Sequence, residues 1–124
     1  MKQKGITEKV PTEHVEQSQF VAWFRSAYPE FLIFAIPNGE YRAMTVAKRL
    51  KAEGVLSGIP DLCVLMPGAS AVFIEMKRQK GGSLSDNQKK VIPQINKLGF
   101  VVLVCKGALD AKNQWEQYLN EVPA

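Results

Sequence analysis

Hydrophobic and polar positions follow two different periods along this chain, and together they predict eight elements. Apolar residues at helical spacing predict helices over residues 13–28, 42–53, 85–98 and 108–120. Runs rich in β-branched and aromatic residues predict strands over residues 31–36, 61–66, 71–77 and 100–105. The order α-β-α-β-β-α-β-α therefore predicts an α/β fold in which helices flank a mixed β-sheet.

Capping residues support two of the helices. Thr12 is a candidate N-cap for the first helix, which Pro29 should end. Ser85 and Gln88 have the spacing of a capping box at the start of the third helix. Pro93 lies inside that helix and should either bend it or reset its start.

The two central strands predict a hairpin with a defined register. If residues 67–69 form a three-residue loop, residue 63 pairs with residue 73 and Asp61 lies directly across from Glu75. Their Cβ atoms would then be about 5 Å apart. Lys77 is two residues beyond Glu75 and lies on the same face of the strand. A register shifted by one residue would send Asp61 to the opposite face.

This pairing places two carboxylates and a lysine at the polar end of two apolar strands. Charged groups are seldom found there unless they hold something. Carboxylate oxygens suit Mg²⁺, and a lysine suits a phosphate oxygen or a water molecule. The alternative is a solvated cross-strand ion pair, which would contribute little to stability.

Composition indicates a small intracellular domain with a basic surface. The chain has 124 residues and a formal net charge of +4, so we expect one domain over residues 12–124 after a polar, loosely ordered lead-in over residues 1–11. No apolar run approaches the ~20 residues needed to cross a bilayer, so we expect no membrane contact and a cytoplasmic location. Cys63 and Cys105 lie in apolar runs and should be buried free thiols. The basic balance is compatible with a polyanionic partner.

Two further residues point toward the same site, each with an alternative. Glu16 shares a predicted helical stripe with Phe20, Trp23 and Ala27, which should face the sheet. It is either a third acidic group near Asp61 and Glu75 or a first-turn glutamate favoured by the helix dipole. Gln88 lies on the predicted core face of its helix, although the capping box explains it completely.

The turn over residues 37–39 offers a second kind of contact. Asn38 and Arg42 flank the start of the second predicted helix, where backbone N–H groups and a guanidinium could hold a phosphate. A plain turn and a solvated arginine explain the same residues.

These motifs, taken in order, resemble the VRR-NUC (virus-type replication-repair nuclease) family, especially its small stand-alone phage and bacterial members. Pro60-Asp61 followed by Glu75-Met76-Lys77 has the form of the PD-(D/E)xK nuclease signature. The other matching segments are Glu16-x-x-Gln19, Pro37-Asn38-Gly39 with Arg42, Gly58-Ile59-Pro60-Asp61-Leu62, and Leu84-Ser85-x-x-Gln88.

The resemblance implies a restriction-endonuclease-like core and hydrolysis of phosphodiester bonds in DNA. Asp61, Glu75 and the carbonyl of Met76 would bind Mg²⁺ or Mn²⁺, and Glu16 would complete the acidic site. Lys77 would orient or deprotonate the attacking water, with Gln88 in support. Basic side chains would follow the DNA backbone, namely Arg42, Lys48, Arg78 and Lys80.

The resemblance also suggests a substrate. Small viral relatives resemble Holliday-junction resolvases, which act as homodimers on branched DNA, and a two-fold junction suits a symmetric dimer. We therefore expect a metal-dependent, structure-selective endonuclease that resolves four-way junctions. The alternatives are a flap or replication-fork endonuclease of broader selectivity and a junction-binding module without catalysis.

Overall fold

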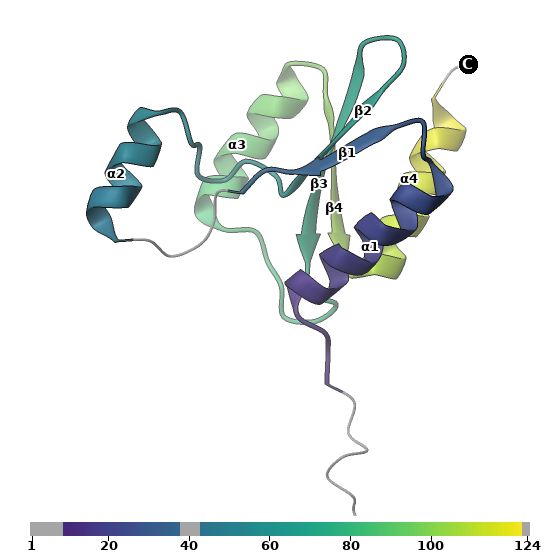
Figure 1. Ribbon diagram of the computed structural model, residues 1–124, viewed down its shortest axis with the longest axis horizontal. Coiled ribbons are helices and arrows are strands. Elements are labelled where there is room, and N and C mark those ends of the chain that lie inside the picture. Colours follow the sequence, from purple (N-terminus) through teal and green to yellow (C-terminus); the bar gives the residue numbers. More distant parts are fainter. Residues whose placement is uncertain (1–8, 38–42, 123–124) are drawn as a thin grey trace, which may run out of the picture.

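A computed structural model of the chain describes residues 9–37 and 43–122 (Figure 1). The described elements follow the order expected from the sequence. They are α1 (Glu13–Ala27), β1 (Leu32–Ala35), α2 (Met44–Ala52), β2 (Leu62–Met66), β3 (Ser70–Lys77), α3 (Asp86–Lys97), β4 (Val101–Lys106) and α4 (Ala108–Glu121).

The four strands form one mixed sheet in the order β1-β2-β3-β4. β1 and β3 run antiparallel to β2, whereas β4 runs parallel to β3. Cys63 pairs with Phe73, and Leu65 pairs with Ala71, which confirms the predicted register. Extending that register beyond the last ladder pair places Asp61 opposite Glu75.

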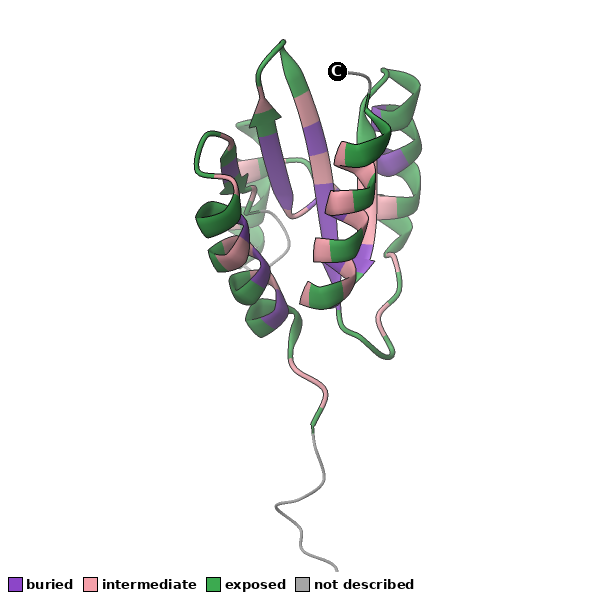
Figure 2. Ribbon diagram, turned by 90° about the vertical axis from the view of Figure 1, so that its right-hand side faces the viewer, coloured by how far each residue is buried: buried purple, intermediate pink, exposed green. Residues whose placement is uncertain are grey.

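The main core lies between one face of the sheet and the helices α1 and α4 (Figure 2). Four strand side chains on this face are fully buried, namely Leu62, Val64, Val72 and Ile74. The predicted stripe on α1 was partly wrong: the buried line runs through Glu16, Phe20 and Phe24 instead of Trp23 and Ala27. The reason is that α1 also packs on α4, where the rings of Phe24 and Trp115 lie 4.9 Å apart.

The opposite face of the sheet is covered only in part. α3 packs on β4 through Val91, Ile92 and Ile95, which are buried. Pro93 lies inside α3 on an exposed position, and the helix still begins at Asp86 after its capping box, so the proline does not reset the start. No described helix packs on this face of β1 and β2.

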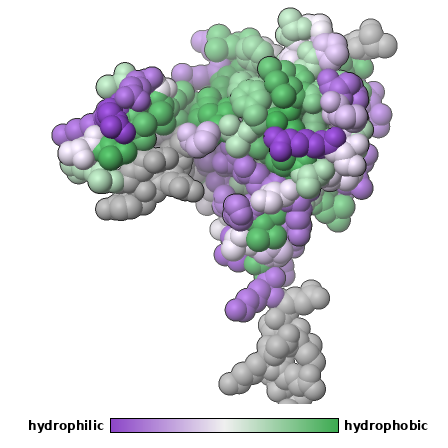
Figure 3. Space-filling model, viewed as in Figure 1, coloured by the Kyte–Doolittle hydropathy of each residue, from purple (hydrophilic) through white to green (hydrophobic). Residues whose placement is uncertain are grey.

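α2 stands away from the body of the protein (Figure 1). None of its residues is buried, and no other described helix or strand packs against it. Hydrophilic and hydrophobic side chains lie side by side on α2, whereas hydrophobic ones gather over the part of the body where β1 and β2 lie (Figure 3). Within the described ranges, no helix combines the length and the apolar character needed to cross a membrane.

Candidate active site

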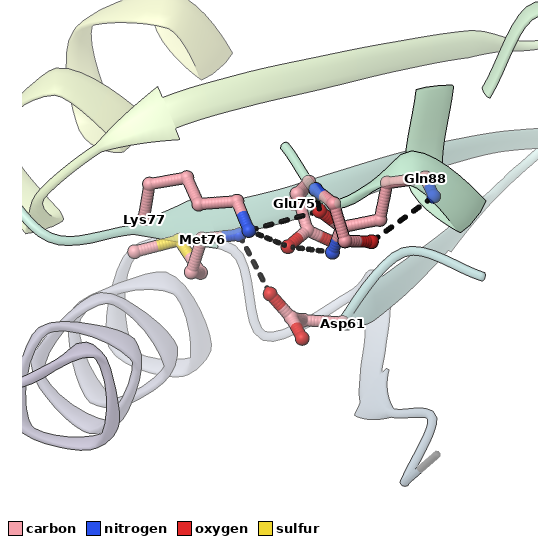
Figure 4. Close-up of polar contacts among 6 residues, drawn as sticks. Asp61, Glu75, Met76, Lys77 and Gln88 are labelled. Carbon is pink, nitrogen blue, oxygen red and sulfur yellow. Dashed lines mark hydrogen bonds and ion pairs between the residues drawn. The ribbon is translucent and has the colours of Figure 1, made fainter. Parts of the chain in front are cut away.

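Asp61 lies where the ladder between β2 and β3 ends. The last pair of that ladder joins Leu62 to Ile74. One residue further out, the Asp61 carboxylate turns toward β3, and its Oδ2 accepts a hydrogen bond of 2.8 Å from the Met76 N–H (Figure 4). The N–H and C=O of one strand residue point to the same neighbouring strand. The Met76 carbonyl is therefore directed to the same side of β3 as Asp61.

Glu75 and Lys77 form a buried ion pair on the face that α3 covers. The Lys77 ammonium lies 3.2 Å from the Glu75 Oε2, and the two side chains are 9% and 1% exposed. This burial rules out the solvated surface ion pair that the sequence left open. A buried pair of opposite charges needs further hydrogen bonds to offset the loss of water.

Gln88 supplies those bonds from the first turn of α3. Its amide Nε2 donates to the Glu75 Oε2 at 2.7 Å, and its Oε1 accepts from the Lys77 ammonium at 2.9 Å. The same Oε1 accepts from the Ser85 N–H at 2.8 Å and so closes the capping box. Capping and site contact were alternative explanations of Gln88 in the sequence, and in the structure one side chain does both.

A glycine sets how closely the segment before Asp61 approaches α3. Gly58 has φ of +93°, and a Cβ atom at this position would lie 2.6 Å from the carbonyl carbon and oxygen of Asn87. The Asn87 amide also donates to the Ser57 hydroxyl at 2.8 Å. The loop that carries Asp61 is therefore docked on the turn that carries Gln88. From the sequence alone, Gly58 was only part of a motif, because no local pattern identified Asn87 as its neighbour.

The electrostatics of the site favour a bound cation. The pKa of the Glu75 carboxyl is raised to about 7, chiefly by burial; the negative charge of Asp61 acts in the same direction, and the Lys77 ammonium acts against it. The second oxygen of Glu75, Oε1, is buried and has no hydrogen-bond partner among the described residues. An ionised, half-satisfied carboxylate beside a second carboxylate is costly unless a cation neutralises it. The donor set of Asp61, Glu75 and a backbone carbonyl therefore fits a hard divalent ion.

Glu16 is buried, but the hydrogen bond that its carboxylate accepts lies at the start of α4 and not at Asp61 or Glu75. Its Oε1 accepts from the Ala108 N–H at 3.0 Å, so it caps the start of α4, whose own N-cap, Gly107, has no side chain to do so. In the described part of the chain, no three acidic, histidine or cysteine residues gather into a group that could hold a metal. The structure thus does not bring Glu16 into one group with Asp61 and Glu75, and its assignment to the acidic site stays a prediction.

Gly107 connects this cap to the site, a role that no motif in the sequence indicated. Its N–H donates to the Lys77 carbonyl at 3.0 Å, and a Cβ on Gly107 would lie 3.0 Å from the Glu16 Oε2. A chain of contacts therefore runs from Glu16 through the first turn of α4 to the backbone of Lys77.

The basic residues predicted to follow DNA are exposed where the structure describes them. Lys48 lies on α2, and Lys80 lies in the loop between β3 and α3. Arg78 is also exposed and donates to the Val10 carbonyl at 3.2 Å. Asn38 and Arg42 lie outside the described residues.

Comparison with known proteins identifies the fold and the family of these residues. Residues 2–109 match the VRR-NUC domain family. The structure is similar to a solved structure described as a VRR_NUC domain protein, with a TM-score of 0.73 and 25% sequence identity over 91% of this chain and 92% of that chain. No curated protein matched the sequence.

Proposed function

Because this chain belongs to the VRR-NUC domain family of nucleases, which have the restriction-endonuclease-like fold, we propose that it is a metal-dependent, structure-selective DNA endonuclease. The observation that supports this most directly is the cluster of Asp61, Gln88 and the buried pair of Glu75 and Lys77, in which one Glu75 oxygen has no hydrogen-bond partner among the described residues. A domain that only bound DNA would have no use for carboxylates facing a polyanion.

Asp61, Glu75 and the Met76 carbonyl are the proposed ligands of Mg²⁺ or Mn²⁺. Asp61 Oδ2 is held by the Met76 N–H, and Glu75 Oε2 is held by Gln88 and Lys77. The oriented Glu75 carboxylate leaves Oε1 for the ion. When bound, such an ion supplies Lewis-acid stabilisation of the charge that develops on the phosphoryl oxygens.

Lys77 is the proposed residue that positions the attacking water. Its ammonium is held at two points, by the Glu75 carboxylate and the Gln88 amide oxygen. The ammonium is therefore already oriented before the reaction, and no free energy is spent on reorienting it. Its third N–H remains to hold a water or a phosphate oxygen. Gln88 is then a positioning residue for both charged groups.

Glu16 is proposed to act on the site indirectly, through the start of α4. It accepts a hydrogen bond from the Ala108 N–H at the start of α4, and Gly107, the N-cap residue just before, donates to the Lys77 carbonyl. Through these contacts Glu16 would fix the backbone from which the Lys77 side chain projects. This role differs from the direct part in the acidic site that the family resemblance implies.

A four-way DNA junction is the proposed substrate, cut by a homodimer. A two-fold symmetric pair of sites matches a junction in which opposing strands are cut together. Exposed basic residues would hold the DNA backbone outside the site, so affinity should fall with salt. The basic candidates in the described part are Lys48, Arg78 and Lys80; Arg42 and the uncharged Asn38 are further proposed DNA contacts that lie outside it.

The test is cleavage of a labelled synthetic four-way junction, run beside a 5′ flap, a splayed arm and linear duplex. Each substrate is incubated with Mg²⁺, Mn²⁺ or EDTA, and Lys77→Ala is compared with Lys97→Ala. Lys97 lies at the exposed far end of α3 and is the matched control for loss of one lysine.

We expect paired symmetric nicks on the junction, no cutting in EDTA, and a loss of about 10³-fold in Lys77→Ala alone. Comparable cutting of flaps and splayed arms would replace the resolvase with a nuclease of broader selectivity. Unchanged cleavage by Lys77→Ala would place the active site elsewhere. Tight junction binding without any cutting would favour the junction-binding module without catalysis.

A further inference from the structure

A groove of about 400 Å³ lies between α1 and β1, the strand at one edge of the sheet. These two elements are neighbours in the fold (Figure 1). Binding sites for small molecules occupy roughly 300 to 1,000 Å³. The groove can therefore take a group of the size of one nucleotide, whereas a DNA duplex cannot enter it.

The lining of the groove has two kinds of side chain. The strands supply only apolar ones, namely Phe34, Ala35 and Leu62, and the Phe34 ring is 39% exposed. The polar ones all come from α1, namely His14, Gln17, Ser18 and Arg25. A nucleobase has the matching character, because its flat faces stack on aromatic rings and its edges form hydrogen bonds.

The charge of the groove suits a phosphodiester strand. None of the described residues that line it is acidic. The Arg25 guanidinium donates to the Ile33 carbonyl at 3.2 Å, and no carboxylate of the described residues pairs with it. A guanidinium has several further N–H donors, so Arg25 can also hold a phosphate oxygen.

The groove begins beside the residue that carries the first carboxylate of the candidate active site. Leu62, which lines the groove, directly follows Asp61 in the chain. Ala35, which also lines it, precedes Ile36, whose N–H donates to the Asp61 carbonyl at 2.8 Å. A DNA strand with a phosphate at Asp61 can therefore continue into the groove.

We propose that this groove holds one unpaired nucleotide at the branch point of the DNA, with its base against Phe34 and its phosphate at Arg25. A nucleotide leaves the base stack at the lowest cost where it is already unpaired. Stacking on an aromatic ring accepts any base, so the groove would select branched over paired DNA without reading a sequence. The inference rests on the proposed function and adds to it a physical basis for structure selectivity.

The first test measures binding in EDTA, so that it does not depend on cleavage. Fluorescence anisotropy gives the Kd for a fully paired duplex and for the same duplex with one extra, unpaired thymidine. Both probes carry the same backbone charges apart from that nucleotide. We expect the wild type to bind the probe with the unpaired thymidine about tenfold more tightly.

Two substitutions on α1 connect this preference to the groove. Ala22 lines the groove and is exposed, so Ala22→Trp fills the groove without disturbing the core. Ala27 is also exposed on α1 but does not line the groove, so Ala27→Trp is the matched control. We expect the preference to fall to within about twofold of equal binding in Ala22→Trp and to stay at about tenfold in Ala27→Trp.

Photo-cross-linking of the wild type then locates the unpaired base. With 5-iododeoxyuridine in place of the unpaired thymidine, we expect cross-links that map to Phe34 or to residues 14–25. Equal binding of the two probes, equal effects of the two tryptophan variants, or cross-links confined to other segments would each overturn the proposal. A change of sedimentation in Ala22→Trp alone would assign the groove to a contact between protein copies and would overturn it as well.

The two proposals can fail separately. Junction cleavage by a protein that shows no preference for the unpaired thymidine would keep the proposed function and refute this inference. The expected preference and cross-links in a protein that cuts no substrate with Mg²⁺ or Mn²⁺ would keep this inference and refute the proposed function.

Discussion

The helices α2 and α3 are alike in sequence and opposite in their surroundings. Each is short and carries three basic residues, Lys48, Arg49 and Lys51 in α2 and Lys89, Lys90 and Lys97 in α3. α3 begins with a full capping box and an acidic first turn, and it buries three apolar residues. α2 has no side-chain cap, no acid in its first turn and no buried residue.

This difference shows how the chain separates a rigid site from an open surface. In α3 the residue that completes the cap, Gln88, also contacts both charged members of the site, so helix formation and site geometry depend on each other. Among the described residues, α2 makes only local hydrogen bonds and one exposed ion pair, so changes in its contacts should not disturb the core. Each of the following substitutions breaks or sharpens this contrast.

Gly58→Ala should have the largest effect on stability. Both Gly58 beside α3 and Gly54 after α2 have positive φ, at +93° and +106°, so an alanine is strained at either position. Only at Gly58 does the new Cβ also meet backbone, at 2.6 Å. We expect a loss of about 3 to 4 kcal/mol in the free energy of unfolding for Gly58→Ala and about 1 to 2 kcal/mol for Gly54→Ala. Urea denaturation measures both, and equal losses would contradict the close packing of the loop on α3.

The pH dependence of stability should reveal the buried carboxyl group of Glu75 under α3. The folded-state pKa of Glu75, about 7, lies above its ordinary value of 4.5, so the folded protein binds this proton more tightly than the unfolded chain does. The free energy of unfolding in EDTA should therefore fall as the pH rises from 4.5 to 7 and should not recover above that range. The change from this one group is on the order of 3 kcal/mol.

Glu75→Gln provides the control for that measurement, because glutamine keeps the shape and does not titrate. Thermal or urea unfolding between pH 4 and 8 should give a flatter profile for the variant. Parallel profiles for the two proteins would mean that Glu75 is not the group responsible. Saturating Mg²⁺ should flatten the wild-type profile as well if the ion binds this carboxylate.

Gln88→Ala should separate the capping role from the site role when it is set beside Ser85→Ala. Each variant removes a member of the capping box, which should cost about 1 kcal/mol of unfolding free energy. Gln88→Ala also strips hydrogen bonds from Glu75 and Lys77, so we expect an additional loss of about 1 to 2 kcal/mol. Cleavage should fall roughly 10²-fold in Gln88→Ala, whereas Ser85→Ala should stay near the wild type. Similar cleavage by the two variants would mean that Gln88 stabilises the start of α3 and does not contribute to the chemistry of the site.

Arg49→Ala on α2 should have the smallest effect. The guanidinium lies 3.8 Å from the Glu53 carboxylate, and these side chains are 68% and 60% exposed. Solvent screens such a pair, so its loss should change the free energy of unfolding by no more than about 0.5 kcal/mol. A loss above 1 kcal/mol, measured at a concentration where the protein is monomeric, would show that α2 packs on the body of its own chain.

Local spacing was sufficient to predict much of the fold and part of the site. The hairpin register follows from a three-residue loop and a two-residue side-chain period, so the positions of Asp61, Glu75 and Lys77 relative to one another could be predicted. The capping box of α3 was equally local, since Ser85 and Gln88 lie three residues apart. The order of elements, the mixed sheet and the buried thiols of Cys63 and Cys105 were also confirmed.

Contacts between distant segments could not be predicted in this way. The hydrogen bond that the Ala108 N–H donates to Glu16 spans 92 residues, and the contact of Gly58 with Asn87 joins a loop to a helix beyond the hairpin. The buried line on α1 passes through Phe24 because α4 packs against that side of α1. The spacing of apolar residues in α1 does not indicate which other helix will pack there.

The sequence by itself thus determined the elements, the hairpin and the charged triplet at its end, because these depend on backbone periodicity and short-range geometry. Only the tertiary structure decided that Glu75 and Lys77 are buried, that Gln88 reaches both, and that Glu16 caps α4. It also decided that α2 and half of one sheet face lack partners. Burial and pairing of this kind depend on which surfaces meet, and that is settled by packing among segments far apart in the chain.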